Sequence, residues 1–248
     1  SAEAGGYHLS FRGLANRHYY LFENHADLTD FQHYYLHGLT LGVDAPFGDY
    51  CYELQAAKQH KFGKTDKSNI NYAYHLDAGR YARFLRKFSE DLGAVRIEGK
   101  IAQVQQHVNG DIRSLVLESG QEITGDLFID CTGFRALLIE QTLKTGYDRW
   151  DHWLPCNKAV VVQTEPGPTM HPYTRAIAHD SGWQWKIPLQ HRVGNGLVYA
   201  SDYLSDEKAR QRLLGNLETS ALIEPRVLSY QTGRRKKLWN KNCVAIGL

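Results

Sequence analysis

The sequence lacks the features that mark zinc-scaffolded, membrane-spanning or secreted proteins. Its four cysteines, Cys51, Cys131, Cys156 and Cys243, include no CxxC pair, which argues against a structural zinc site or a disulfide framework and favours a reduced, cytoplasmic setting. No apolar run approaches the roughly 20 residues that a membrane span needs. Residues 1–6 are small and polar, unlike a signal peptide. The net charge of +2 is too small to indicate a nucleic-acid partner.

What the sequence does have is ordinary globular composition with many aromatic rings. Its 248 residues suffice for one large domain or two small ones with a sizeable core. Aromatic residues make up 12%, including 15 tyrosines and 5 tryptophans. Such a content suits stacking on a planar ligand and suits a well-packed core equally, so composition leaves both interpretations open.

One helix and one following strand system are predicted from hydrophobic periodicity. The helix spans residues 78–92, with Asp77 as its N-cap and Gly93 as its C-terminal stop; its apolar face comprises Ala78, Tyr81, Leu85, Phe88 and Leu92. Apolar residues then recur at every second position, beginning with Val95 and Ile97, which predicts the start of a strand. Strands at 101–104 and 112–117 flank Asn109-Gly110, which predicts a hairpin with positive φ at both turn residues.

A third strand is predicted at 122–130. Its run Leu127-Phe128-Ile129 predicts burial on both faces, as in a parallel sheet, and residues 134–144 then look helical. Loops and short strands are predicted at 12–74 after a short strand at 7–11. The later elements are strands at 158–164, 175–179, 183–187, 197–201 and 227–232 and a helix at 206–217. The fold class is therefore α+β with a mixed-to-antiparallel sheet.

The end of the third strand, Asp130-Cys131-Thr132-Gly133, is the first feature that points to chemistry. A strand that enters a small-residue turn and then a helix gathers backbone N–H groups, which receive a phosphate or the edge of a flavin. A plain tight turn is the alternative. Asp130 itself is a candidate catalytic carboxylate, but capping this turn is the favoured role at a buried strand end.

The second feature is the segment Gly182-Trp-Gln-Trp-Lys-Ile-Pro188. In a strand, Trp183, Trp185 and Ile187 project to one face and form a broad apolar wall, and Pro188 ends the strand. An aromatic strand of the core is the alternative, and the pattern by itself does not decide between them.

The pattern G-W-x-W-x-I-P resembles the signature of flavin-dependent tryptophan halogenases. Other segments are similar to that family in the same order: His75-Leu-Asp-Ala78, Asp126–Gly133, Gly233-Arg234, Trp239 and Asn242–Leu248. These matches extend over nearly the whole chain. The resemblance implies an FAD-binding box of the glutathione-reductase or flavin monooxygenase type, with residues 1–248 as the central part of a single halogenase domain. Because no GxGxxG loop is present, we expect the nucleotide-binding loop and the C-terminal substrate region to lie outside these residues, which leaves the domain incomplete at both ends.

The resemblance also implies the reaction. A separate flavin reductase supplies reduced FAD (FADH2), which reacts with O₂. A halide ion, chloride or bromide, then attacks the flavin hydroperoxide, and the hypohalous acid so formed halogenates an electron-rich aromatic such as tryptophan or an indole. Such chemistry belongs to antibiotic biosynthesis. The family's essential lysine is expected five residues before Phe11, where Gly6 stands, so the catalytic residue is not assigned; a lysine close to Phe11 is predicted for the complete protein.

Site residues follow from the same resemblance. The wall between flavin and substrate comprises Trp183, Trp185, Ile187 and Pro188. Cofactor-binding residues are Ile101, Cys131, Thr132, Gly133, Gly247 and Leu248, and substrate-binding residues are Tyr20 and Phe22. The partners implied are the reductase and an aromatic small molecule, with no nucleic acid and no membrane, and a homodimer is left open.

Other interpretations remain at this stage. A flavin monooxygenase of the same fold would hydroxylate instead, although the two tryptophans argue against it, and a non-catalytic relative would only bind an aromatic ligand. His33 and His37 share a spacing that suits metal ligands, but no third ligand accompanies them, so no metal site is predicted. The basic run Arg234–Lys237 is expected to be a solvated edge or loop rather than a nucleic-acid patch.

Overall fold

The computed structural model describes residues 7–8, 31–63 and 70–247. Their contacts divide the chain into two compact units. The first unit takes residues 1–81, 159–199 and 203–227, and the second takes residues 82–158, 200–202 and 228–248. Within the described residues, no helix is both long and apolar enough to cross a membrane.

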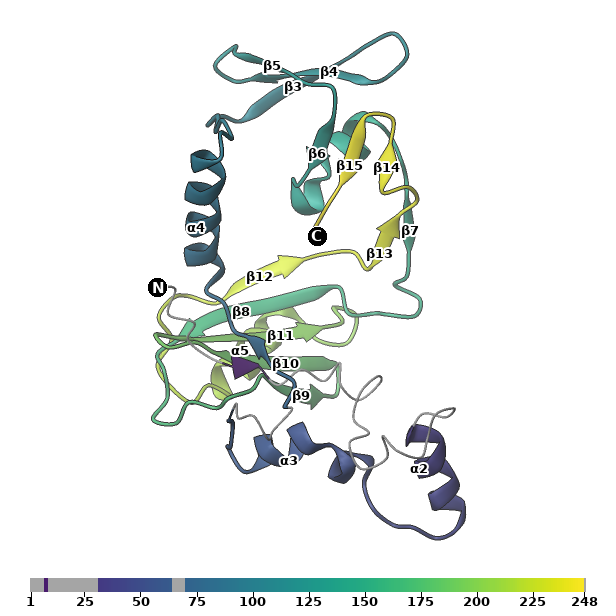
Figure 1. Ribbon diagram of the computed structural model, residues 1–248, viewed down its shortest axis with the longest axis vertical. Helices are drawn as coiled ribbons and strands as arrows, with labels where there is room; N and C mark the ends of the chain where they lie inside the picture. Colours follow the sequence, from purple (N-terminus) through teal and green to yellow (C-terminus); the bar gives the residue numbers. More distant parts are fainter. Residues whose placement is uncertain (1–6, 9–30, 64–69, 248) are drawn as a thin grey trace. The chain divides into compact units, whose positions relative to one another are not determined.

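The first unit is built on a five-stranded sheet with strand order β12-β8-β11-β10-β9 (Figure 1). The strands are β8 (Lys158–Thr164), β9 (Arg175–His179), β10 (Gly182–Pro188), β11 (Val193–Tyr199) and β12 (Arg226–Ser229). Strand β10 is antiparallel to both β9 and β11. The other elements are α2 (Phe31–Thr40), the 3₁₀ turn Phe47–Tyr50, α3 (Tyr52–Lys58), α5 (Asp206–Gly215) and the short pair β1 (Tyr7–His8) and β2 (Ala73–Tyr74).

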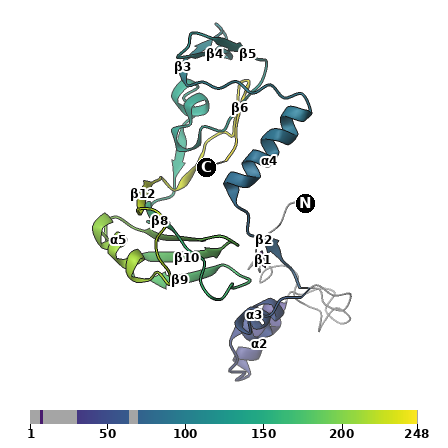
Figure 2. The same cartoon turned by 90° about the vertical axis from the view of Figure 1, so that its left-hand side faces the viewer.

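Helix α5 covers one face of this sheet, as Figures 1 and 2 show. Ser205 caps the helix by accepting a hydrogen bond from the Lys208 amide. Its apolar side packs onto side chains of β8 and β11 in a core of Val160, Val162, Leu197, Tyr199, Leu204, Ala209 and Leu213. Burial of this apolar set stabilises the unit. The core lies between α5 and one face of the sheet and does not extend to the opposite face.

The second unit contains three small sheets. One is the antiparallel sheet of β3 (Ile101–Gln106), β4 (Ile112–Leu117) and β5 (Glu122–Thr124). Another joins β6 (Phe128–Asp130), β15 (Cys243–Ala245) and β14 (Trp239–Asn240), and the last pairs β7 (Tyr147–Arg149) with β13 (Gly233–Arg235). Helix α4 (Ala78–Asp91) has residues 78–81 in the first unit and residues 82–91 in the second.

Helix α4 confirms the sequence prediction closely. Asp77 Oδ1 accepts a hydrogen bond from the Arg80 amide at 2.9 Å, and Gly93 takes a positive φ of 96° just past the helix end. The apolar face that includes Phe88 and Leu92 is present but exposed.

Several predicted elements differ from the structure. Residues 95–98 form no strand. The segment 12–74, expected to hold loops and short strands, contains the short strand β2 but also the helices α2 and α3. The strand predicted at 122–130 is two strands in different sheets. At the hairpin, Gly110 alone has positive φ, because the connection runs over residues 107–111 instead of two residues.

The run Leu127–Ile129 is buried on one face only. Phe128 belongs to the core of the second unit, while Leu127 is 54% and Ile129 57% exposed, so the prediction of two buried faces was wrong. The parallel pairing that it implied is confirmed, because β6 is parallel to β15. The helix predicted at 134–144 is instead a 3₁₀ turn, Gly133–Arg135, and a π-helical turn, Leu137–Thr142. Ala136, with a φ of 45°, interrupts the helix between them.

Candidate active site

Strand β10 carries its tryptophans on the face of the sheet opposite the α5 core, which we call the open face. Gln184 and Lys186 are 0% and 5% exposed and lie on the opposite side from Trp183, which is 44% exposed. The two indole rings lie 5.7 Å apart between centroids, at an interplanar angle of 52°. Neither ring belongs to the core under α5. Trp183 and Trp185 thus lie outside the core under α5, and the projection of Trp183, Trp185 and Ile187 to one face is confirmed.

Small residues on the neighbouring strands make room for these rings. Trp185 lies between Ala176 of β9 and Gly196 of β11 in the antiparallel register. A methyl group at Gly196 would overlap the six-membered part of the Trp185 ring, so this ring lies flat across the backbone of β11. Glycine at this position therefore sets the orientation of the tryptophan, because no other residue leaves the space above the strand.

Replacing Gly196 with alanine is expected to displace the Trp185 ring and to lower the free energy of unfolding by about 1 to 3 kcal/mol through overpacking. Gly194→Ala is the matched control, since a methyl group there, two residues earlier on β11, meets only atoms at 3.8 Å or more. Urea denaturation and tryptophan fluorescence of both variants measure the effect. Identical behaviour of the two variants would contradict this description of the Trp185 ring.

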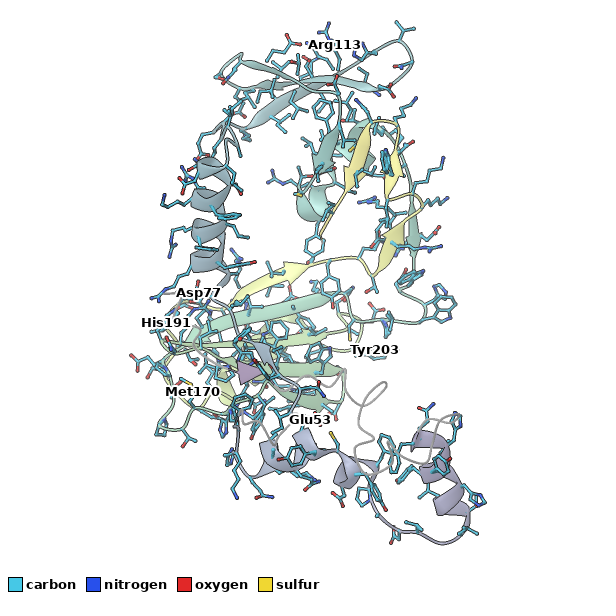
Figure 3. All side chains as sticks on the ribbon, in the orientation of Figure 1. Glu53, Asp77, Arg113, Met170, His191 and Tyr203 are labelled. Atoms are coloured by element: carbon cyan, nitrogen blue, oxygen red, sulfur yellow. The ribbon has the colours of Figure 1, made fainter. Side chains whose placement is uncertain are left out.

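The segment His75–Asp77 anchors the far end of the tryptophan strand. The buried His75 ring donates from Nδ1 to the Pro188 carbonyl at 2.8 Å, and its Nε2 lies 3.0 Å from the Thr174 hydroxyl. Asp77 lies beside the turn after β10, 3.1 Å from His191 and 3.4 Å from Arg192 (Figure 3). The hydrogen bond from the Arg80 amide, together with the charge of Arg192, holds the pKa of Asp77 below its usual range. His75 and Asp77 thus hold the hairpin of β10 and β11, from which they are far away in the sequence.

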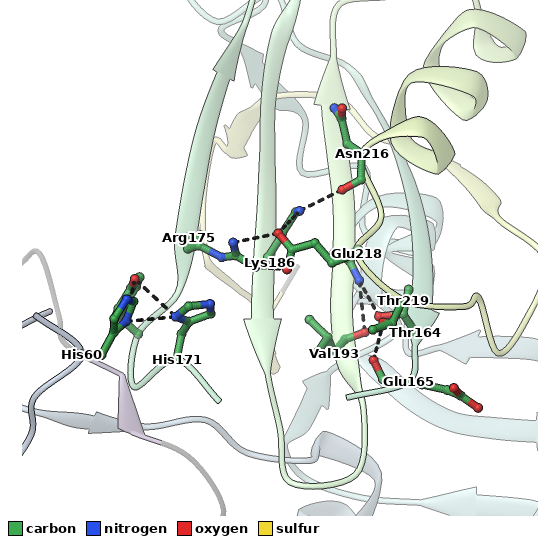
Figure 4. Close-up of polar contacts among 12 residues, drawn as sticks. His60, Thr164, Glu165, His171, Arg175, Lys186, Val193, Asn216, Glu218 and Thr219 are labelled. Atoms are coloured by element: carbon green, nitrogen blue, oxygen red, sulfur yellow. Dashed lines mark hydrogen bonds and ion pairs between the residues drawn. The ribbon is translucent and has the colours of Figure 1, made fainter. Parts of the chain in front are cut away.

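An ion pair between the buried Lys186 and the half-exposed Glu218 holds the covered face of β10. Lys186 Nζ donates to Glu218 at 2.9 Å and to the Asn216 carbonyl at 2.8 Å, and Arg175 contacts both carboxylate oxygens at 2.8 and 2.6 Å (Figure 4). The hydrogen bonds from Arg175, aided by those from Lys186, outweigh burial and lower the pKa of Glu218 to about 2. The acidic partner keeps the Lys186 charge compensated inside the sheet.

This ion pair predicts a loss of stability in acid. Because the Glu218 pKa falls on folding, its contribution is fully present above the unfolded pKa of about 4.5 and disappears as the pH falls towards 2. The carboxylate is half exposed, so solvent screening reduces the contribution to about 1 kcal/mol. Glu218→Gln is expected to flatten the dependence of unfolding free energy on pH in this window, whereas the exposed control Glu224→Gln leaves it unchanged. Equal pH curves for wild type and Glu218→Gln would contradict this.

In the second unit, two small-residue turns meet at one sheet edge. Strands β6 and β15 run parallel, so their carboxyl ends coincide, and Cys131–Gly133 follows one strand while Ile246-Gly247 follows the other. The Ile246 amide donates to the Asp130 carbonyl at 3.0 Å and ties the two turns together. Ligands bind at such edges in open α/β sheets.

Asp130 holds the turn in place. Its carboxylate is 4% exposed and accepts hydrogen bonds from the Thr132 amide and hydroxyl at 2.9 and 2.6 Å and from the amides of Leu138 and Ile139 at 2.9 and 2.8 Å. Burial raises the pKa of Asp130, but these hydrogen bonds outweigh it and keep the pKa below its ordinary value. The predicted role of capping the turn is confirmed.

A cavity of about 520 Å³ opens at this edge. Its lining includes Asp130, Gly133, Phe134, Arg135, Glu140, Tyr147, Arg234, Arg235, Ile246 and Gly247. Gly133 and Gly247 have φ of 65° and 94°, and a methyl group on either would meet no atom within 4 Å. Both turns therefore present bare backbone to open space, which fits the flat edge of a ring system. The volume is that of an ordinary small-molecule site.

The basic run Arg234–Lys237 is exposed as expected except at Arg235, and its first two residues, Arg234 and Arg235, also line this cavity. Arg235 pairs with Glu140 at 2.8 Å, and its guanidinium lies 4.8 Å above the Tyr147 ring, while Arg234 lies 3.5 Å from Asp148. The expectation missed these contacts because they depend on the pairing of β13 with β7. The only signal in the sequence was the resemblance at Gly233-Arg234.

The remaining predicted site residues have various positions. Ile101 is in β3 opposite Leu117 and is not part of the cavity lining, and Cys131 and Thr132 are in the turn beside it. His33 and His37 are exposed on α2. Gly6, Tyr20, Phe22 and Leu248 lie outside the described residues.

Comparison with protein families matches the model described as tryptophan halogenase to residues 8–248. The chain belongs to this family. A tryptophan 6-halogenase of Streptomyces toxytricini is 38% identical over 186 residues, which covers 73% of this chain and 36% of the relative. The chain therefore spans about a third of the length of that curated relative.

Solved structures agree with the family. A flavin-dependent halogenase of Xanthomonas campestris, Xcc4156, is 52% identical with a TM-score of 0.82, covering 88% of this chain and 45% of that one. BrvH, a flavin-dependent halogenase of Brevundimonas sp. BAL3, is 38% identical with a TM-score of 0.81, covering 99% and 49%. The α+β fold is thus that of flavin-dependent halogenases.

Proposed function

We propose that the protein is a flavin-dependent halogenase that chlorinates or brominates an electron-rich aromatic, such as tryptophan or an indole. The observation that carries this proposal is the position of Trp183 and Trp185 on the open face of β10, where two large rings form a wall instead of filling a core. The tryptophan 6-halogenase of Streptomyces toxytricini that the chain resembles supports the class of substrate.

The cavity beside Cys131–Gly133 and Gly247 is the proposed site of the flavin, within an FAD-binding box of the glutathione-reductase type. Gly133 and Gly247 would approach the ring edge with bare backbone, and Thr132 would keep the turn in shape through Asp130. The arginines in the lining outnumber its acids, Asp130 and Glu140, and favour an anionic cofactor. When bound as FADH2, the flavin supplies the reaction of O₂ with halide that gives hypohalous acid.

The protein itself would position the substrate and keep it away from the flavin. Trp183, Trp185, Ile187 and Pro188 would separate substrate from flavin, so that oxygen transfer to the substrate does not compete with halogenation. Residues 1–248 would form the central part of one halogenase domain. A separate reductase would supply the reduced flavin, and Ile101, Leu248, Tyr20 and Phe22 remain proposed contacts of cofactor or substrate.

The reaction products test the proposal. Protein supplied with FADH2, O₂ and bromide is expected to convert tryptophan or an indole into a brominated product, identified by mass spectrometry. A hydroxylated product would show a flavin monooxygenase, and binding of the aromatic without turnover would show a non-catalytic relative. Either result would overturn the proposal.

A further inference from the structure

Three side chains from two distant segments converge in the first unit, away from the tryptophan face. His60 Nδ1 lies 3.2 Å from His171 Nδ1, and the Tyr173 hydroxyl oxygen lies 3.5 Å from each of these nitrogens. Figure 4 shows the two imidazoles with their ring edges turned toward each other. The three donor atoms therefore form a nearly equilateral triangle.

The size of this triangle matches the ligand spacing of a tetrahedral metal ion. Ligands at bond lengths of about 2.0 to 2.1 Å around Zn²⁺ lie about 3.3 Å from one another. Imidazole nitrogen is a preferred ligand of zinc, and the phenolate form of tyrosine offers an anionic oxygen, as the carboxylates that bind zinc do. Within the described residues, no three His, Cys, Asp or Glu side chains are grouped to hold a metal. The third donor of this triangle is instead a tyrosine, Tyr173.

We propose that His60, His171 and Tyr173 form a binding site for a divalent transition-metal ion, zinc being the best fit, which joins the end of α3 to the β8–β9 connection. The ion keeps a fourth position for water. If Tyr173 binds as phenolate, its proton passes to solvent.

The backbone at His60 gives an independent reason to look for a function. Helix α3 ends in a Schellman motif, in which the His60 amide donates to the Ala57 carbonyl and the Lys61 amide to the Ala56 carbonyl, both at 2.9 Å. His60 occupies the left-handed position of that motif, with a φ of 54°. Glycine is the usual residue there because it has no side chain to clash. A histidine in its place adopts an unfavourable conformation that aims an imidazole at His171.

The partner segment is also suited to holding ligands. His171 and Tyr173 flank Pro172 in the bend that leads into β9, and both side chains approach His60. A hydrogen bond between the two imidazoles alone, with no ion, is the competing interpretation of the geometry.

Zinc titration of the full protein, followed by competition with a chromophoric chelator and by thermal melting, tests the proposal. One equivalent is expected to bind and to raise Tm. His60→Gly is the most informative variant, because glycine suits the Schellman position and the fold should melt at or above the wild-type Tm without zinc. We expect this variant and His171→Ala to lose zinc affinity by about tenfold or more.

The matched control is His33→Ala, which breaks the other closely spaced histidine pair, His33 and His37 on the exposed face of α2. It should bind zinc as the wild type does. Tyr173→Phe should weaken binding and remove the phenolate-to-metal absorption band seen when Cu²⁺ replaces zinc. The proposal is overturned if the wild type binds no zinc, or if His33→Ala rather than His60→Gly and His171→Ala loses it.

Discussion

Replacing Trp183 or Trp185 with alanine is expected to lower halogenation by roughly 10- to 100-fold, while the affinity for FAD changes by less than about threefold. The reason is geometric. The two rings stand on the open face of β10, so their loss removes the wall but leaves the core under α5 intact. Halogenation rates under saturating flavin and a separate flavin titration measure the two effects.

Trp153→Ala is the matched control, because Trp153 is 72% exposed and lies in the second unit. It should change neither rate nor affinity. Trp185→Phe keeps a ring over Gly196 and should retain more activity than Trp185→Ala. An equal loss of halogenation and FAD binding in the tryptophan variants would show a structural role for these residues.

Replacing Asp130 with alanine is expected to cost about 3 to 5 kcal/mol of unfolding free energy, because the amides of Leu138 and Ile139 would be left buried without an acceptor. The turn at Cys131–Gly133 would lose its shape at the same time. FAD affinity is therefore expected to fall by about tenfold or more, as happens when groups that orient a binding site are removed. Urea denaturation and flavin titration measure the two losses.

Asp126→Ala, four residues earlier and exposed, is the control and should affect neither quantity. Asp130→Asn keeps the size of the side chain but has only one carbonyl oxygen for these donors, so it should be intermediate in stability. A fully stable Asp130→Ala protein would contradict the role of this carboxylate in holding the turn.

The sequence predicted those features that depend on local pattern. Alternation along Gly182–Pro188 placed the tryptophans on one face, and Asp77 and Gly93 fixed the ends of α4. The parallel strand before Asp130 was predicted from its apolar run. Each of these depends on residues that are close in the sequence, where period and capping rules apply.

The features that escaped prediction depend on distant partners or on weak patterns. Helix α2 has apolar, tyrosine and histidine side chains spread around its surface, so no amphipathic period marked it. The contact of His75 with Pro188 joins residues 113 apart in the sequence, and Arg235 reaches the cavity only through the β7–β13 pair. Such contacts arise from tertiary packing, and local patterns in a single sequence do not show which distant residues meet.

The ratio of halogenated to hydroxylated product, measured with and without bromide, tests the central proposal most directly. Tryptophan or an indole is incubated with the protein, FADH2 and O₂, and the products are separated and identified by mass. The wall formed by Trp183 and Trp185 predicts brominated product when bromide is present and no hydroxylated product when it is omitted. Hydroxylated product in the absence of bromide, at a rate similar to that of bromination, would contradict the account.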